Sequence, residues 1–251
     1  MSLRPDQPAA LPKFRLSGLA LSTLAIVALT GLLFLLASLL AALLLGTGPL
    51  QALQAQMHDM AAVRANETAL VLLQVFSMLV YLSHLAAVAL VGRMRPTLPL
   101  AQRVSFFDWH GDRQFWVLLA LMLAYVVMAG LALEQFLPES KDWLLLPKSP
   151  LGLFLSLILV VALAPIAEEL LFRGWIYTGL RLRLAFVPTL LITSALFALP
   201  HFERTFVYAL VVFPVGLALG FVRERYGSVK ASMIFHAMFN LFGWIVNNLQ
   251  A

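Results

Sequence analysis

Long apolar runs alternate with short polar segments along almost the whole chain. A helix that crosses the hydrocarbon core of a bilayer needs about 20 predominantly apolar residues. By this criterion the chain holds about seven candidate spans, with a range of six to eight. Their ranges are 16–46, 69–92, 114–134, 151–180, 185–203, 206–222 and 229–249. The pattern therefore predicts an all-α, polytopic membrane protein.

The polar positions divide the chain into three parts. Residues 1–15 hold three prolines and predict a short flexible N-terminal arm. Residues 16–150 predict transmembrane helices with few buried ionisable groups. The first run is longer than the core of a signal peptide, so we interpret it as a retained span. Residues 151–249 place prolines, glutamates, histidines and an asparagine within apolar helices, so we expect any chemistry in this helical core.

The composition supports a membrane protein and excludes several classes of site. Hydrophobic residues make up 62% of the chain and charged residues 12%, whereas soluble proteins are about 45–50% apolar and about 25% charged. The chain has no cysteine, which excludes disulfides, thiolate metal sites and a cysteine nucleophile. No nucleic-acid-binding motif accompanies the net charge of +5, so we expect a lipid bilayer and no nucleic acid as partner.

The charges also predict an orientation, because every second connecting segment is basic. The basic residues of these segments are Arg4, Lys13, Arg15, Arg93, Arg95, Arg103, Arg113, Arg181, Arg183, Arg223, Arg225 and Lys230. Cytoplasmic loops carry the excess of Lys and Arg. With seven spans, the pattern predicts a cytoplasmic N-terminus and a C-terminus on the other side. It is typical of a protein of the bacterial inner membrane.

Three polar motifs interrupt the apolar helices of the core, and the first is "EELLFR" at 168–173. Glu169 and Arg173 are four residues apart, so they share a helix face and can neutralise each other. Glu168 is rotated by about 100° and need not share that partner. Pro165 lacks an N–H and predicts a kink just before the glutamates. The alternative is that both glutamates are solvated at a helix end.

The second and third motifs are "FALPH", which ends at His201, and "FHAMFN", which holds His236 and Asn240. Phe197 and His201 share one face of a helix, and so do His236 and Asn240. A lone histidine in an apolar helix is more often a packing residue than a catalyst, and we interpret His84 in this way. Asn and His also join membrane helices through hydrogen bonds, which is the alternative for the third motif.

The expected depths of these residues favour one joint site. At 1.5 Å per residue, Glu168 lies about 18 Å from the cytoplasmic helix end and His201 about 21 Å. His236 and Asn240 lie at about 12 and about 18 Å. Three helices thus offer polar groups within one layer about 10 Å thick, which separate structural roles would not predict.

In this order, "EELLFR", "FALPH" and "HAMFN" resemble the three motifs of the CPBP family, the CAAX-processing and bacteriocin-processing intramembrane proteases. The resemblance covers about residues 150–245. It implies an α-helical endopeptidase with a site inside the bilayer. Glu168, His201, His236 and Asn240 match the family's catalytic positions, and Glu169 and Arg173 match supporting positions. The implied substrate is a membrane-associated or lipid-modified peptide or protein, cut near a chain end.

Two mechanisms remain open for such a protease. In the preferred hypothesis Glu168 is a general base that holds a water with His201, while His236 and Asn240 donate hydrogen bonds to the oxyanion. No cofactor is then needed. In the alternative, Glu168, His201 and His236 bind zinc, which keeps one position open for water. No HExxH helix is present, and an asparagine is a poor zinc ligand.

Two other classes of function compete with proteolysis. Buried Glu, His and Arg are also typical of transporters and proton relays, but these commonly show internal repeats, which we do not find. The other class is a non-catalytic membrane scaffold or immunity protein that binds a partner. The complete set of motif residues makes this less favoured.

Overall fold

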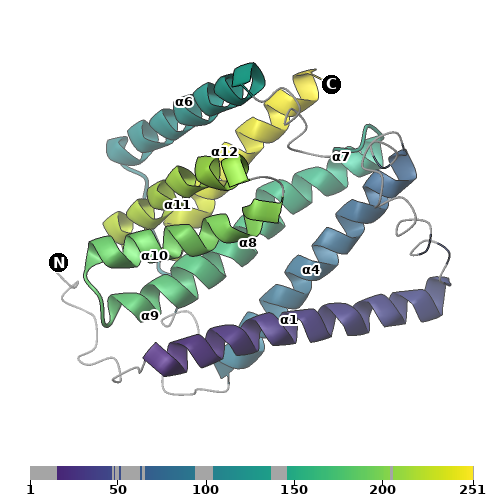
Figure 1. The fold of residues 1–251 in the computed structure, drawn as a ribbon, viewed down its shortest axis with the longest axis horizontal. Helices are drawn as coiled ribbons and strands as arrows, with labels where there is room; N and C mark the ends of the chain where they lie inside the picture. The colour runs from purple at the N-terminus through teal and green to yellow at the C-terminus, as the bar shows by residue number, and fades with distance from the viewer. Residues whose placement is uncertain are drawn as a thin grey trace.

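The structure is a computed structural model, and it describes residues 16–46, 48, 51, 63, 66–93, 104–136, 146–203 and 206–250. These residues form an all-helical assembly of long helices (Figure 1). The first three long helices are α1 (Leu16–Leu45), α4 (Glu67–Arg93) and α6 (Arg113–Phe136). The predicted arm of residues 1–15 lies outside the described residues.

The fourth apolar run forms a continuous helical segment in which two π-helical stretches interrupt the α-helix. It consists of α7 (Pro150–Leu157), the π-helical η2 (Ile158–Leu163), α8 (Ala164–Glu169), the π-helical η3 (Leu170–Tyr177) and α9 (Thr178–Arg181). The Ser149 side chain caps the start by accepting a hydrogen bond from the Gly152 N–H, and Pro150 occupies the first turn. Turns of π-helix are rare and often occur at functional sites.

The last three runs form α10, α11 and α12. Helix α10 (Phe186–Ala198) continues into a short 3-10 helix, η4 (Leu199–Glu203). Helix α11 (Phe206–Tyr226) and helix α12 (Val229–Gln250) are joined by a tight turn at Gly227, whose positive φ of 64° favours glycine.

Length and composition allow six of the described helices to cross a membrane, and a shorter apolar helix spans Phe186–His201. This result confirms the predicted all-α, polytopic fold. Each predicted run contains a helix, and the observed bounds differ from the predicted ones by only a few residues, except that α11 extends to Tyr226. Many large apolar side chains of α1, such as Leu21 and Leu43, are exposed, as expected for a helix that faces lipid.

The described basic residues of the connections gather at one end of the assembly, which we call the basic end. It comprises Arg93, Arg113, Arg181, Arg183, Arg223, Arg225 and Lys230. These residues lie at or next to the ends of α4, α9 and α11 and the starts of α6, α10 and α12, which lie toward the left of Figure 1. Ion pairs hold this end together, for example between Arg181 and Glu224 at 2.9 Å and between Lys230 and Asp108 at 2.6 Å. The basic connections that alternate along the sequence thus lie at the same end of the helices.

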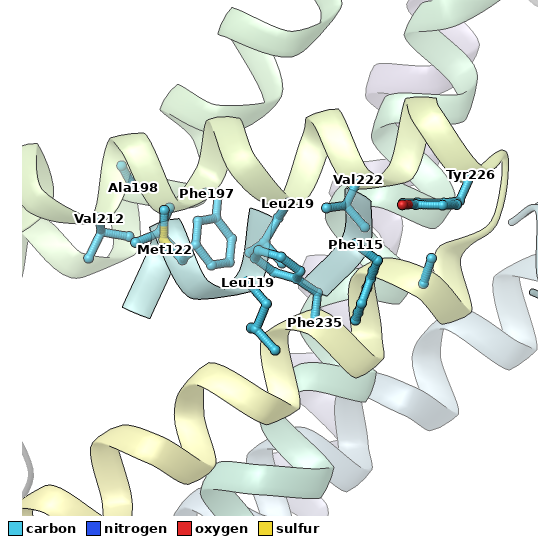
Figure 2. Packing of buried hydrophobic residues seen from close by; sticks show 12 residues of the cluster. Phe115, Leu119, Met122, Phe197, Ala198, Val212, Leu219, Val222, Tyr226 and Phe235 are labelled. Carbon is cyan, nitrogen blue, oxygen red and sulfur yellow. The ribbon is translucent and has the colours of Figure 1, made fainter. Parts of the chain in front are cut away.

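Two apolar clusters attach the N-terminal helices to the core. Phe115, Leu119 and Met122 of α6 pack against α11 and α12, and Phe197 belongs to the same cluster (Figure 2). On the other side, α1 and α4 pack against Trp175 and Ile176 of η3. The helical segment that carries the two glutamates is therefore supported by helices from residues 16–150. The boundary predicted at residue 150 stays a prediction.

Candidate active site

Glu169 and Arg173 form a fully buried ion pair within one helical segment. Arg173 Nη1 lies 2.8 Å from Glu169 Oε1, and both side chains are 0% exposed. Arg173 Nη2 donates a second hydrogen bond to the backbone carbonyl of Gly216 on α11, at 3.0 Å. The guanidinium carbon also lies 4.3 Å from the centre of the Phe197 ring. The pair that the spacing of four predicts is present, and it joins the segment to α10 and α11.

Glu168, the adjacent carboxylate, has different surroundings. Its Oε1 accepts a hydrogen bond from the Tyr81 hydroxyl of α4 at 2.6 Å. Its Oε2 lies 4.0 Å from His236 Nε2, and its side chain is 20% exposed. A separation of 4.0 Å is too long for a direct hydrogen bond but suits a bridging water. One glutamate is thus neutralised by arginine, and the other is partly open.

The His236 imidazole lies between the two glutamates. Its Nδ1 is 3.1 Å from Glu169 Oε1, and its Nε2 faces Glu168. The ring stacks on Phe239 with a centroid distance of 5.0 Å. Because the Glu169 carboxylate can only accept a hydrogen bond, we assign the Nδ1 proton to this contact. In the neutral ring, Nε2 then presents its lone pair toward Glu168.

Phe197 connects the second motif to this centre. Its ring centroid lies 5.5 Å from that of His201 and 5.9 Å from that of His236. His201 lies in the 3-10 helix η4, where its Nδ1 lies 3.1 Å from the Phe197 carbonyl oxygen. A carbonyl can only accept, so the Nδ1 proton points to the backbone and leaves Nε2 as the acceptor. The structure thus brings Glu168, Glu169, Arg173, His236 and Phe197 together, and the His201 ring lies near that of Phe197.

Asn240 makes a contact that explains the role of Pro165 in the fold. In η2, the N–H of Ala164 bonds to the Leu159 carbonyl five residues back. The Val160 carbonyl would pair with residue 165 in the same π register, but proline has no N–H. Asn240 Nδ2 donates to this carbonyl at 2.8 Å. A π-helical turn thus lies just before Pro165, where the sequence predicts a kink. Helix α12 supplies the hydrogen bond to Val160 that proline cannot donate.

A glycine on α11 allows the close approach that the Arg173 contact needs. A Cβ atom built on Gly216 would lie 3.0 Å from Ser194 Cα on α10. Such a distance is shorter than ordinary van der Waals contact, so the two helices could not pack as they do with a larger residue. The same glycine presents its carbonyl to Arg173. Its place in the site follows from packing between helices, which the sequence pattern does not reveal.

The candidate zinc ligands Glu168, His201 and His236 each contact another group in the structure. Within the part of the chain that the structure describes, no group of three or more His, Cys, Asp or Glu side chains is placed to hold a metal ion. His236 Nδ1 bonds to Glu169, and the rings of His201 and His236 both lie near that of Phe197.

Tyr81 is a residue of the site that the sequence motifs did not indicate. Its position in the sequence could have indicated it. Tyrosine is enriched at membrane interfaces, so a tyrosine near the middle of an apolar helix such as α4 is unusual. His84, on the same helix, pairs through Nδ1 with the Thr30 hydroxyl of α1 at 3.2 Å. That contact agrees with the interpretation of His84 as a packing residue.

The core of the chain matches a known protein family. Residues 147–242 match the Rce1-like family, described as type II CAAX prenyl endopeptidase Rce1-like. Neither the curated proteins nor the solved structures gave a match. The matched region contains all three motifs, and the match supports the resemblance to the CPBP family of intramembrane proteases. The match supports an intramembrane endopeptidase of the CAAX type.

Proposed function

We propose, on the premise of this family match, that the protein is an endopeptidase that uses Glu168 to activate water. Its substrate is a membrane-associated, lipid-modified peptide, cut near one end. The observation that carries this proposal is the contrast between two adjacent glutamates. Glu169 is neutralised by Arg173, whereas Glu168 is partly exposed and faces His236 Nε2 across 4.0 Å.

The proposed reaction begins with a water bound between Glu168 Oε2 and His236 Nε2. Glu168 takes one proton from this water while the water oxygen attacks the carbonyl carbon of the peptide bond. The resulting tetrahedral intermediate carries an oxyanion. It collapses as the C–N bond breaks, and Glu168 returns the proton to the departing amine. This sequence balances without a cofactor.

Three polar residues complete the proposed site. His201 helps to hold the water, and His236 and Asn240 stabilise the oxyanion. In its imidazolium form, His236 can donate a hydrogen bond from Nε2 while Nδ1 keeps its contact with Glu169. The contact with Val160 uses one of the two N–H donors of the Asn240 amide. The proposal assigns the second donor to the oxyanion.

The proposed orientation follows from the basic end. Because Lys and Arg accumulate in cytoplasmic loops, we place the ends of α4, α9 and α11 in the cytoplasm. This places the start of α1 there as well, because Leu19 and Gly179 approach each other closely. Such charge asymmetry is typical of the bacterial inner membrane, which we propose as the location.

The proposal is tested by comparing wild type, Glu168→Gln and Asp108→Asn at equal expression. Asp108→Asn is a matched change from carboxyl to amide at the exposed basic end. New membrane-associated peptide termini are measured by mass spectrometry in host cells. Purified proteins in liposomes also receive a peptide that ends in a farnesylated cysteine and three further residues. The released tripeptide is quantified.

We expect cleavage by wild type and Asp108→Asn, and a loss of roughly 100- to 10,000-fold in Glu168→Gln. Cleavage by Glu168→Gln at the wild-type rate would refute the assignment of the base. Wild type that produces neither new termini nor tripeptide would favour a non-catalytic scaffold. An activity that chelation removes and stoichiometric zinc restores would favour the metal-dependent alternative.

A further inference from the structure

Tyr81 extends the site into the N-terminal helices. Its hydroxyl donates to Glu168 Oε1 at 2.6 Å, across 87 residues of sequence. This distance is typical of a hydroxyl that donates to a carboxylate. Tyr81 lies outside residues 147–242, the region that matches the Rce1-like family. The family motifs therefore say nothing about the contact.

Helix α4 is fixed to the glutamate segment on both sides of Tyr81. At one end, the Glu67 carboxylate accepts hydrogen bonds from the backbone N–H groups of Lys148 and Ser149, at 2.8 and 2.9 Å. Toward the other end, Val88 and Val91 are buried in one cluster with residues of η3. With two anchors along its length, α4 holds the Tyr81 hydroxyl at a defined height against Glu168.

The hydroxyl determines which carboxylate oxygen faces the imidazole. A glutamate side chain has several rotatable bonds, and among the residues that the structure describes no arginine pairs with Glu168 as Arg173 pairs with Glu169. With Oε1 held by Tyr81, Oε2 is the oxygen directed at His236 Nε2, 4.0 Å away. The water proposed as nucleophile lies between these two atoms, so its position depends on how the carboxylate is oriented.

We propose that Tyr81 is a positioning residue that orients the Glu168 carboxylate toward the reacting water. The inference rests on the proposed function. Tyr81 acts through Glu168, so its hydroxyl contributes to the chemical step and not to substrate affinity. A displacement of about 1 Å in a reacting group can cost up to about 100-fold in rate. We expect Tyr81→Phe to lower kcat by roughly 10- to 100-fold with KM unchanged.

Tyr125→Phe is the matched control. The Tyr125 hydroxyl also donates across helices, from α6 to the Val211 carbonyl of α11 at 2.9 Å, but it bonds to no carboxylate there. Full-length wild type, Tyr81→Phe, Tyr125→Phe and Glu168→Gln are placed in liposomes. Release of the tripeptide from the farnesylated peptide gives kcat and KM. Thermal unfolding shows whether each variant is folded.

Infrared spectroscopy of the same samples tests the hydrogen bond without requiring turnover. The carboxylate stretch that disappears in Glu168→Gln belongs to Glu168. We expect this band to shift in Tyr81→Phe and to stay in place in Tyr125→Phe. An unshifted band would overturn the inference, and so would a wild-type kcat or an effect confined to KM. If wild type does not cleave the peptide, the proposed function fails for that substrate, and the infrared band still decides whether Tyr81 orients Glu168.

Discussion

The polar groups at the basic end and those at the middle of the helices lie on the same segments but have different surroundings. At the basic end, Arg181 and Glu224 are 13% and 26% exposed, and Arg225 and Asp112 are about half exposed. In the middle, Glu169 and Arg173 are completely buried. A charge at the basic end that loses its partner can still contact water, whereas Glu169 and Arg173 have no such alternative because both are fully buried.

In the proposed mechanism, one glutamate of the site serves stability and the other serves chemistry. At the basic end, the acidic side chains described above are paired with basic ones. In the middle, Arg173 pairs with Glu169, and the adjacent Glu168 is not neutralised by this arginine. We expect substitutions in the middle to affect stability or catalysis strongly, and those at the basic end to have small effects on both.

The largest loss of stability is expected for Arg173→Met. This change leaves the Glu169 carboxylate buried without its cationic partner, which costs about 3–5 kcal/mol in comparable cases. The variant should unfold at a much lower temperature than wild type in liposomes and accumulate less in membranes. Adding Glu169→Gln should restore part of the stability, because no unpaired charge then remains. A single variant as stable as wild type would contradict the role given to the pair.

A smaller loss is expected for Gly216→Ala. The added methyl group would meet Ser194 and force α10 and α11 apart, which typically costs about 1–3 kcal/mol. The shift also moves the carbonyl that holds Arg173, so kcat should fall together with thermal stability. Gly243→Ala is the control, since a Cβ atom on that α12 glycine has no neighbour within 4 Å. Equal melting temperatures for the two variants would contradict the close approach.

At the basic end, Glu224→Gln should cost about 1 kcal/mol or less, because partly exposed ion pairs contribute little. Glu224 accepts hydrogen bonds from Tyr177 and Arg181, and an amide oxygen can still accept one of them. We expect the amount of folded protein to fall slightly while kcat per folded molecule stays at the wild-type value. A large loss of kcat would show that the two polar regions are coupled.

The smallest effect is expected from acid at the connection before α6. Hydrogen bonds from Lys230 and from the Tyr226 hydroxyl lower the pKa of Asp108 and of Asp112 below the ordinary value. A lowered pKa stabilises the folded state above the unfolded pKa of about 3.9, and this contribution is lost as the pH falls through the folded value. The protection of residues 104–112 against hydrogen exchange, corrected for the intrinsic exchange rate, should therefore fall below about pH 4. In the double variant Asp108→Asn, Asp112→Asn, this fall in protection should be absent.

The helices and one ion pair could be predicted from the sequence, because each follows from a local rule. An apolar run must be long enough to cross the bilayer. This criterion located all seven helices, and most of the predicted bounds lie within a few residues of the observed ones. A spacing of four places Glu169 beside Arg173 whatever the other helices do. The equal depths of the three motifs also predicted a shared layer. Contacts among Glu168, Glu169, Phe197, His201 and His236 agree with it.

The rest of the site depends on contacts between helices, which no local rule determines. The sequence could not show that Tyr81 would reach Glu168, because that requires the rotation of α4 against α8. It also could not show that Asn240 would bond to Val160. Pro165 predicts an unpaired carbonyl nearby, but the donor that satisfies it comes from the last helix. The catalytic roles of the motif residues stay predictions.

The location of the Glu169–Arg173 pair within one segment has a consequence for biosynthesis. The chain is made from its N-terminus, so residues 150–181 meet the lipid before α12 has been synthesised. Their buried arginine and one of their glutamates can already neutralise each other, so insertion does not wait for a later helix. Glu168 acquires its imidazole neighbour only when His236 arrives. Under the proposed mechanism, a nascent or truncated chain can thus enter the membrane before it is able to hydrolyse the proteins around it.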